Sequence, residues 1–427
     1  MSADRRPEPN PFARRGPSRR GVLGLAALTG AGLLAGCARE RPSSGLTAGG
    51  GGSGSPTLTA ASPSSPVRWP ILEGNAPIAA GLAPEKDATL QLYNYVDYIN
   101  PDVIKSFEKK YEDTGVKVVV STFNDTNESL AKIRAGGSPY DVYFPSYDQI
   151  GKLATAGLVR PLQHAYIPNI TNVWPQFTDP WYDQGWQYTV PYVTYTTGIG
   201  WRSDRVNEDI GARANPYDVF WDPQYAGRLA VLDDYREVIS MAILRAGGTD
   251  INTGDDAVLG KVREDLAAMA KATRPQVTIT DYIAIPEGKL DISQAWSGDM
   301  IAAQGYLPKG TDASVLRYWF PADGKGMVNN DLMMILSGGK NPVLAHLFLN
   351  HLLDDEVARE NFTFVGYQPP LNSLDPSRLV ADGYAPQGLA AATVLPSYFE
   401  SGYRSLELTP EAEGKWQDTW TRFKAGA

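Results

Sequence analysis

From about residue 88 the pattern of apolar and polar positions becomes regular, with short apolar runs that alternate with amphipathic stretches. Short runs bounded by turn residues predict strands, and apolar positions three and four apart predict helices. The first predicted elements are strands at 88–96, 115–123 and 140–146 and helices at 101–114, 128–137 and 147–157. Strands and helices that alternate in this way favour a parallel sheet covered by helices.

A second α/β stretch follows. Its predicted elements are short strands within 188–202, a strand at 227–234, a helix at 257–273, a strand-turn-helix at 289–304, a strand at 326–336 and helices at 342–353 and 355–362. Ligands of open α/β sheets bind outside the carboxyl ends of the strands. Residues 94–98 and 146–148, which follow the first and third strands, are therefore candidates for a site.

The first 36 residues have the pattern of an export signal. Six arginines precede a glycine-rich apolar stretch that is too short to span a membrane. Arg19 and Arg20 lie side by side before it, as in twin-arginine (Tat) signals. The stretch ends in Leu-Ala-Gly followed by Cys37, which resembles a bacterial lipobox. We therefore expect lipid on Cys37 to anchor the protein to the outer face of the cytoplasmic membrane or in the periplasm.

Composition changes again between the signal and the regular region. Residues 37–86 are rich in Gly, Ser, Pro, Thr and Ala and predict a flexible tether. The whole chain has a formal net charge of −9. Removal of the signal leaves about −13, because that segment holds six arginines and two acidic residues. An acidic exported protein is a poor binder of nucleic acid and attracts cations.

Residues suited to catalysis are scarce. His346 and His351 are five positions apart on a predicted helix, off the face that a zinc pair needs, and His164 stands alone. We expect core or surface roles for them. Cys37 is the only cysteine, which leaves no thiol nucleophile and no disulfide. The sequence has no nucleophile-elbow or phosphate-loop motif. We therefore expect no enzyme activity, no cofactor and no metal site.

Carboxylates beside aromatic residues at loop ends are the main candidates for function. They are Tyr95, Asp97, Tyr98, Tyr147, Asp148, Asp234, Glu237, Trp296, Asp299, Asp331 and Tyr367. Carboxylates accept charge-assisted hydrogen bonds from ammonium groups, and aromatic faces attract cations and pack against methylene chains. The alternative is structural, because aspartates at loop ends often cap helices. Asp234, with Glu237 three positions later, resembles a capping box before an apolar helix.

Several segments, in the correct order, resemble the polyamine (spermidine/putrescine) periplasmic-binding proteins of ABC importers. They are LYNYVDYINPDVIKSFEKKYEDTGVKV, STFNDTNESLAKI, YDVYFPS, VPYVTYTTGIG, LDDYREVISMAIL, AWSGDM and LFLNHLLDDEVARENFTFVGYQPP. The resemblance implies an α/β, two-lobed fold of the type II periplasmic-binding-protein kind, with two crossover segments and a ligand cleft between the lobes. Lobe 1 would comprise 88–195 plus about 330–375, and lobe 2 would comprise 196–329 plus about 376–427.

The resemblance also implies which residues bind the ligand. The matching positions are Tyr95, Asp97, Tyr98, Ser146, Tyr147 or Asp148 (depending on a one-residue slip), Asp234, Glu237, Trp296, Asp299, Asp331 and Tyr367. Tyr95 stands where the family has a tryptophan, and Val96 replaces a threonine. Asn329 replaces a tryptophan of the spermidine-type members. Four carboxylates survive in alignable places, which favours a cation with two or more amines.

The implied function is that of an extracytoplasmic solute-binding lipoprotein, expected to be a monomer. It would capture putrescine or spermidine and pass it to an ABC permease, which is powered by its own ATPase. Val96 and Asn329 leave open a first alternative, in which the same fold binds another amine or cation, a sugar or a metal. A second alternative is a secreted hydrolase with paired carboxylates. It needs one acid held protonated near neutral pH, whereas a box of four carboxylates favours cations.

Overall fold

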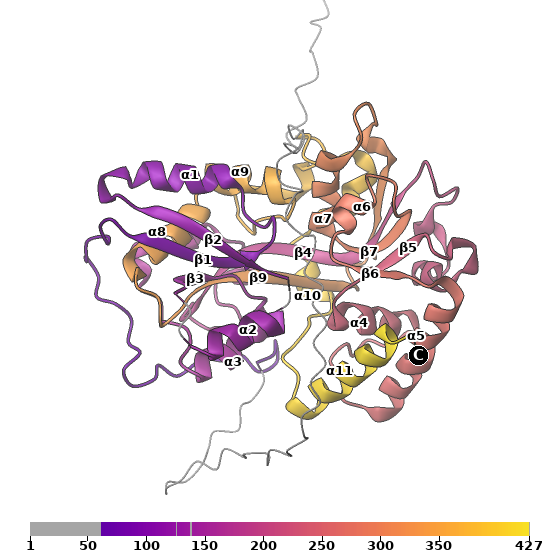
Figure 1. Cartoon of the computed structure of the whole chain (residues 1–427), viewed down its shortest axis with the longest axis horizontal. Helices are drawn as coiled ribbons and strands as arrows, with labels where there is room; N and C mark the ends of the chain where they lie inside the picture. The colour runs from indigo at the N-terminus through magenta and orange to yellow at the C-terminus, as the bar shows by residue number, and fades with distance from the viewer. Residues whose placement is uncertain (1–60, 125, 137–138, 427) are drawn as a thin grey trace, which may run out of the picture. The chain divides into compact units, whose positions relative to one another are not determined.

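The computed structural model describes residues 61–124, 126–136 and 139–426 (Figure 1). The expected export signal, Cys37 and the first part of the expected tether lie outside the described residues. Within these ranges, no helix is both long and apolar enough to cross a membrane.

One mixed sheet runs through the described chain in the order β2-β1-β3-β9-β4-β7-β5-β6, with β8 paired to β4. The strands are β1 (Thr89–Tyr95), β2 (Lys117–Phe123), β3 (Val142–Tyr143), β4 (Thr189–Arg202), β5 (Leu229–Leu232), β6 (Gln276–Thr278), β7 (Ile292–Trp296), β8 (Leu316–Trp319) and β9 (Met327–Ile335). The sets β1–β3 and β5–β7 are each internally parallel. β4 and β9 pair antiparallel with each other and with their neighbours. The expected parallel sheet is therefore correct at the two ends and wrong at the centre.

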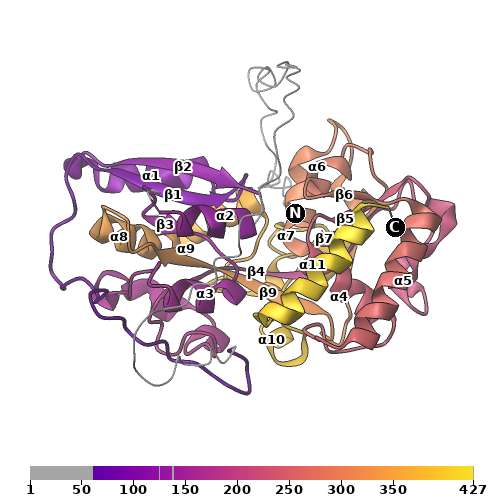
Figure 2. The ribbon, with the colours of Figure 1, turned by 60° about the horizontal axis from the view of Figure 1, so that its bottom comes forward.

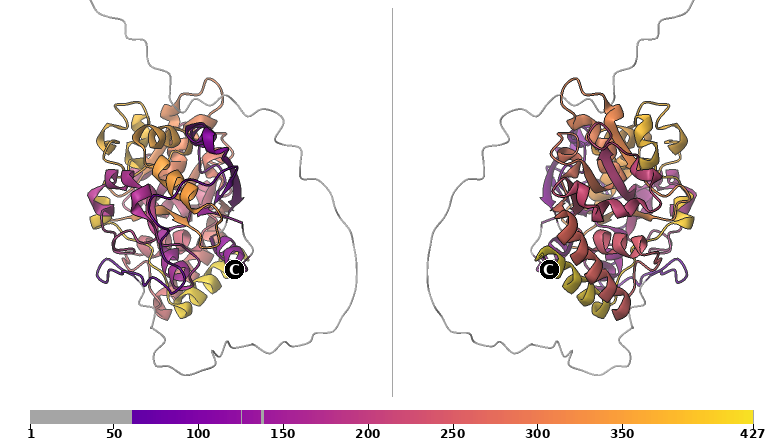
Figure 3. Two further views of the ribbon diagram at one scale, coloured as in Figure 1. Left: turned by 90° about the vertical axis from the view of Figure 1, so that its left-hand side faces the viewer. Right: turned by 90° about the vertical axis from the view of Figure 1, so that its right-hand side faces the viewer.

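Helices cover both faces of each end of the sheet (Figures 1 and 2). At the β1–β3 end they are α1 (Pro101–Lys110), α8 (Pro342–Leu352) and α9 (Asp355–Val365) on one face and α2 (Thr126–Arg134) and α3 (Ile150–Thr155) on the other. At the β5–β7 end they are α4 (Tyr235–Arg245), α5 (Asp256–Thr273) and α11 (Pro410–Lys424) on one face and α6 (Asp281–Ala284) and α7 (Ser297–Ala302) on the other. α10 (Tyr398–Ser401) lies near the middle. Figure 3 shows α11 beside α5.

The alternation of side chains along the strands explains this layering. Leu92 of β1 packs in the core beneath α1 and α8, whereas its neighbour Tyr93 packs in the core beneath α2 and α3. Val231 of β5 faces α4, α5 and α11, and its neighbour Ala230 faces the α7 side. Each end of the sheet thus has a core on both faces, as the period of two in a strand requires.

The segment 188–202 forms one long strand, β4, rather than the expected short strands. Every residue of β4 is buried, because the strand has partners on both edges and packing on both faces. Its pairing with β9 shifts register between Pro191 and Val193. The expected lobe boundaries at 195/196 and 329/330 fall inside β4 and β9, the two strands that join the halves of the sheet. The division into lobes stays a prediction.

The two histidines of α8 are core residues, one of the two roles that the sequence left open. His346 is fully buried, and its Nε2 accepts the N–H of Gln163 while its Nδ1 donates to the carbonyl of Pro342. His351 is also buried and contacts the Ser106 hydroxyl. Burial lowers the pKa of His346 to about 4, which keeps the ring neutral.

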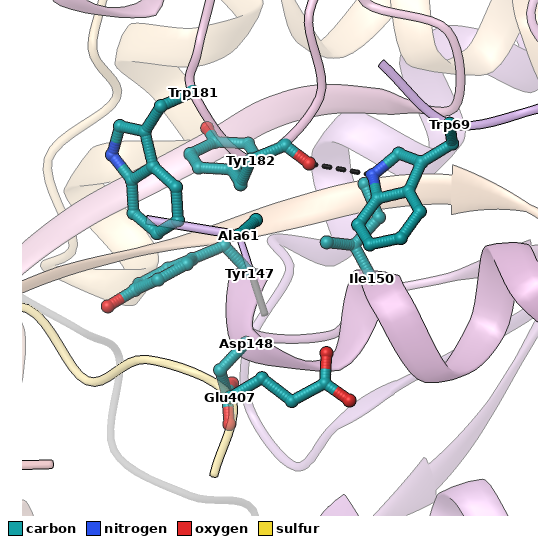
Figure 4. Close-up of a pocket in the computed structure, with 8 residues that line it drawn as sticks. All are labelled: Ala61, Trp69, Tyr147, Asp148, Ile150, Trp181, Tyr182 and Glu407. Atoms are coloured by element: carbon teal, nitrogen blue, oxygen red, sulfur yellow. Dashed lines mark hydrogen bonds between the residues drawn. The ribbon is translucent and has the colours of Figure 1, made fainter. Parts of the chain in front are cut away.

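Residues 61–86 pack against the folded body, so the expectation of a free tether up to residue 86 is wrong for this part. The Trp69 side chain is buried, and its Nε1 donates to the carbonyl of Tyr182 at 2.8 Å (Figure 4). The Glu85 carboxylate accepts the N–H groups of Val343 and Leu344 in the first turn of α8. Composition predicted a tether here, but a buried tryptophan, a helix cap and further hydrogen bonds from Asn75 and Leu82 hold the segment against the body.

Replacement of Trp69 by alanine tests this packing. Trp69→Ala is expected to lower the free energy of unfolding by about 3–5 kcal/mol, because it leaves a large cavity. Ile71→Ala is the matched control, since Ile71 is 50% exposed in the same segment. Urea unfolding of the signal-free protein measures both. Equal effects of the two substitutions would contradict the packing described.

Candidate functional site

Four of the predicted carboxylates come together where the two halves of the sheet meet. Asp331 lies on β9, Asp234 and Glu237 lie at the start of α4, and Asp299 lies on α7. Glu237, Asp299 and Asp331 are only 4–7% exposed. Among the described residues, none of the four forms an ion pair. Buried carboxylates without a cation cost free energy, because an ionised group loses its hydration when it is buried.

Hydroxyl groups surround Asp331. Tyr98 and Ser146 each donate to it at 2.8 Å, one to each carboxylate oxygen. The Tyr195 hydroxyl lies 3.5 Å from Oδ1. Burial raises the pKa of Asp331 to about 6, although these hydroxyl groups oppose the shift. The structure thus brings together Tyr98, Ser146 and Asp331, and adds Tyr195.

Asp234 is the N-cap of α4, which is the structural alternative that the sequence offered for it. Its Oδ1 accepts the N–H groups of Arg236 and Glu237, at 2.8 and 3.2 Å. Both bonds use the same oxygen, so capping leaves the second oxygen available. Burial raises the pKa of Asp234 to about 6. Capping and a role in a site are therefore compatible.

Glu237 does not complete the capping box. Its Oε1 accepts the indole N–H of Trp296 at 3.2 Å, and its Oε2 is buried with no hydrogen-bond partner among the described residues. Burial, and then the nearby charge of Asp234, raise the pKa of Glu237 to about 8. The side chain is turned away from the helix end and toward β7.

Asp299 faces Tyr367 across a glycine. The Tyr367 hydroxyl donates to Asp299 Oδ1 at 2.8 Å, while Oδ2 has no partner in the described part of the chain. A Cβ at Gly298 would lie 2.3 Å from the Tyr367 ring, so only glycine allows this approach. Burial raises the pKa of Asp299 to about 7.

Aromatic rings connect the carboxylates from the two halves. Tyr98 lies edge to face with Tyr95 and with Tyr367, with centroids 5.5 and 4.9 Å apart. Tyr195 has the same relation to Trp296 and Tyr367. The predicted aromatics therefore form one continuous wall that runs from Asp331 to Asp299.

Three predicted residues lie at the edge of this cluster, and the charge of one of them, Asp148, adds to burial in raising the pKa values of Asp234 and Asp331. Asp97 is exposed in a left-handed conformation, and its Oδ2 accepts the hydroxyl of Tyr282 on α6 at 3.2 Å. Tyr147 and Asp148 line a small cavity with Glu407, on the side where residues 61–69 pack (Figure 4). The Tyr147 hydroxyl donates to Asn329. Asn329, which stands where spermidine-type members have a tryptophan, therefore forms a hydrogen bond within the protein and adds no ring to the wall.

Sequence reasoning missed two residues of the cluster. Tyr195 lies in the middle of β4, and its signal was the period of two in YVTYTTG, which aims alternate residues at one face. Asp281 begins α6 directly after β6, so the rule that sites follow strand ends could have found it. Its side chain is fully buried.

The chemistry that this site supports is the binding of cations with an apolar body. The free oxygens of Glu237 and Asp299 accept charged donors, and the rings pack against methylene groups. The described residues contain no group of three or more His, Cys, Asp or Glu that could hold a metal ion.

Known proteins give an independent view of the same chain. A family model described as bacterial extracellular solute-binding protein matches residues 102–386. A spermidine/putrescine-binding periplasmic protein of Haemophilus influenzae is 27% identical over 281 residues, 65% of this chain and 74% of that one. A putrescine/cadaverine-binding protein of Pseudomonas aeruginosa is 29% identical over 301 residues, 69% and 83% of the two chains.

Solved structures confirm the expected fold class. A spermidine/putrescine ABC transporter substrate-binding protein from Streptococcus pneumoniae superposes with a TM-score of 0.63 at 25% identity. The match covers 79% of this chain and 99% of that one. The fold is therefore the α/β periplasmic-binding-protein fold.

The pKa of Asp331 predicts a pH-dependent stability. An unfolded aspartate has a pKa of about 3.9, and the folded value is about 6. The folded state keeps this proton to a higher pH, so Asp331 contributes stability that is complete below about pH 4 and lost as pH rises through 6. In Asp331→Asn, the free energy of unfolding relative to wild type should rise by about 2–3 kcal/mol from pH 4 to 7.5.

Urea unfolding across this pH range measures that difference. Asp312→Asn is the control, because Asp312 is an exposed cap whose pKa is lowered by hydrogen bonds from Ser314. Its difference from wild type should change in the opposite direction. A difference for Asp331→Asn that does not vary with pH would contradict the proposed burial.

Proposed function

Because the chain belongs to the bacterial extracellular solute-binding protein family, we propose that it captures a polyamine outside the cytoplasm and delivers it to an ABC importer. Members of this family bind a solute and do not transform it, so the paired-carboxylate hydrolase is set aside. The observation that carries the proposal is the set of buried carboxylates without cations, of which Glu237 and Asp299 each have an oxygen with no partner among the described residues.

The positive charges of the ligand would neutralise the carboxylates of the site. Its ammonium ends would bind Asp234, Glu237, Asp299 and Asp331, and its methylene chain would pack against Tyr95, Tyr98, Trp296 and Tyr367. The relatives named above for spermidine, putrescine and cadaverine support this substrate class. The aromatic wall spans both halves of the sheet, so closure of two lobes around the ligand is the mechanism we propose.

A different amine with the same ammonium chemistry is the second candidate. Val96 is exposed beside the site, and Asn329 binds Tyr147 and the N–H of Ser405 in place of forming a wall. These two positions change the shape and polarity that a spermidine-length ligand would meet. A calorimetric series of putrescine, cadaverine, spermidine and spermine ranks the polyamines by length, and weak heat with all four would favour this second candidate.

Asp331→Asn tests the binding proposal. It is expected to weaken polyamine binding by about 2–5 kcal/mol, because it removes one partner of a buried charge pair. Isothermal titration calorimetry on the signal-free protein measures the affinity. Asp323→Asn is the control, since Asp323 is exposed and pairs with Lys325 in the turn before β9. No heat and no thermal shift with any of the four polyamines would overturn the proposed function.

We also propose that lipid on Cys37 holds the protein at the membrane, which the order of Leu-Ala-Gly-Cys at the end of the apolar stretch supports. Cys37→Ser is expected to move the protein from the membrane fraction to the soluble fraction of cells. The Arg19→Lys, Arg20→Lys double variant tests export separately, because it leaves the cysteine intact. A Cys37→Ser protein that stays in the membrane fraction would contradict the anchor.

A further inference from the structure

A fifth acidic residue, Asp281, lies beside Asp299 at the α6–α7 end of the site. Asp281 is fully buried, and neither of its carboxylate oxygens has a hydrogen-bond partner among the described residues. Asp299 Oδ2 is also buried and free of partners, while Oδ1 is occupied by the Tyr367 hydroxyl. Three carboxylate oxygens therefore lack donors at one place.

The groups around this pair supply no positive charge. Burial, and then the charge of Asp299, raise the pKa of Asp281 well above its usual range. The N–H groups at the start of α6 lie nearby but are not aligned for a hydrogen bond. Among the described residues, the other titratable groups that face the pair are acids or phenols: Tyr367 after α9, Tyr318 on β8, Tyr282 on α6 with its partner Asp97, and Tyr306, whose ring contacts Tyr282.

Two carboxylates cannot bind each other unless one of them holds a proton, since both are acceptors when ionised. Two neighbouring carboxyl groups in a buried site cannot both stay ionised, so the pair retains one proton when nothing else neutralises it. The free site thus has one proton and a net charge of about −1 at Asp281 and Asp299.

We propose that Asp281 and Asp299 together bind one ammonium end of the ligand, which displaces the proton that the two carboxyl groups share. This inference rests on the proposed function. An ammonium group has three N–H donors, and the pair offers three oxygens without donors. The proton leaves to solvent as the ammonium enters, so the net charge of the pair with its occupant stays at about −1 while both ionised carboxylates contact one cation.

Asp281 also lies next to a residue that contacts the other half of the protein. Tyr282, the next residue, donates to Asp97 in the segment after β1. An ammonium bound at Asp281 would therefore order α6, whose Tyr282 contacts the first half of the protein. This contact places Asp97, an expected ligand residue, at the edge of the site.

Proton release on binding tests the inference. Putrescine is titrated into the signal-free protein at pH 7 in two buffers of different ionisation enthalpy. Wild type is expected to release more protons per ligand than Asp281→Asn, by about one. Asp281→Asn is also expected to bind at least tenfold more weakly, because one of the two carboxylates that hold the ammonium is gone. Glu287→Gln, an exposed carboxylate just after α6, is the control and should match wild type.

The outcomes separate this inference from the function on which it rests. Wild type that binds no polyamine overturns the proposed function. Wild type that binds, with the same affinity and proton release in Asp281→Asn, overturns only the role of the pair. Should Asp281→Asn not fold, Asp299→Asn reports the same shared proton. Loss of the extra proton release in that variant supports the inference, and unchanged release overturns it.

Discussion

The desolvation of carboxylates at the junction of the two halves is the constraint on which the site depends. An ionised carboxylate removed from water needs hydrogen-bond donors or a cation. The protein supplies hydroxyl donors to Asp331 and backbone donors to Asp234, but it leaves oxygens of Glu237 and Asp299 without a partner in the described chain. The raised pKa values of these groups have one common first cause, which is burial. A bound cation would relieve this cost, so the same feature that lowers the stability of the free protein would contribute to the binding energy of a cationic ligand.

The antiparallel strands at the centre of the sheet position these carboxylates. β4 and β9 pass from one half to the other, so Asp331 on β9 and Tyr195 on β4 stay next to both parallel ends. α4 and α7 begin at the carboxyl ends of β5 and β7 and bring Glu237 and Asp299 to the same place. Tyr98 and Tyr367 then connect Asp331 to Asp299 through ring contacts and two hydroxyl bonds. Movement of one half against the other would therefore change the surroundings of every carboxylate at once.

The N-terminal segment shows how composition can mislead. Residues 61–86 resemble a linker by their glycine, serine and proline content, yet Trp69 and Glu85 fix the segment to the body. Composition describes the average of a segment, whereas order depends on single contacts such as a buried indole or a capped helix end. The pocket beside Trp69 is also lined by Tyr147, Asp148, Trp181, Tyr182 and Glu407, so this surface is built from four distant parts of the chain.

The sequence predicted the element types at both ends of the sheet and the fold class, and it named most of the acidic and aromatic residues that the structure brings together. Those depend on local periodicity, on strand ends and on a resemblance that runs through many segments. Long-range packing sets the other features: residues 189–202 form one central antiparallel strand, Asp97 lies at the edge while Tyr147 and Asp148 line another cavity, and Asp281 lies beside Asp299. The reason is physical: burial, and with it the protonation of a carboxylate, is set by residues far away in the chain. No local pattern around Asp281 reports that its neighbour in space is a second acid.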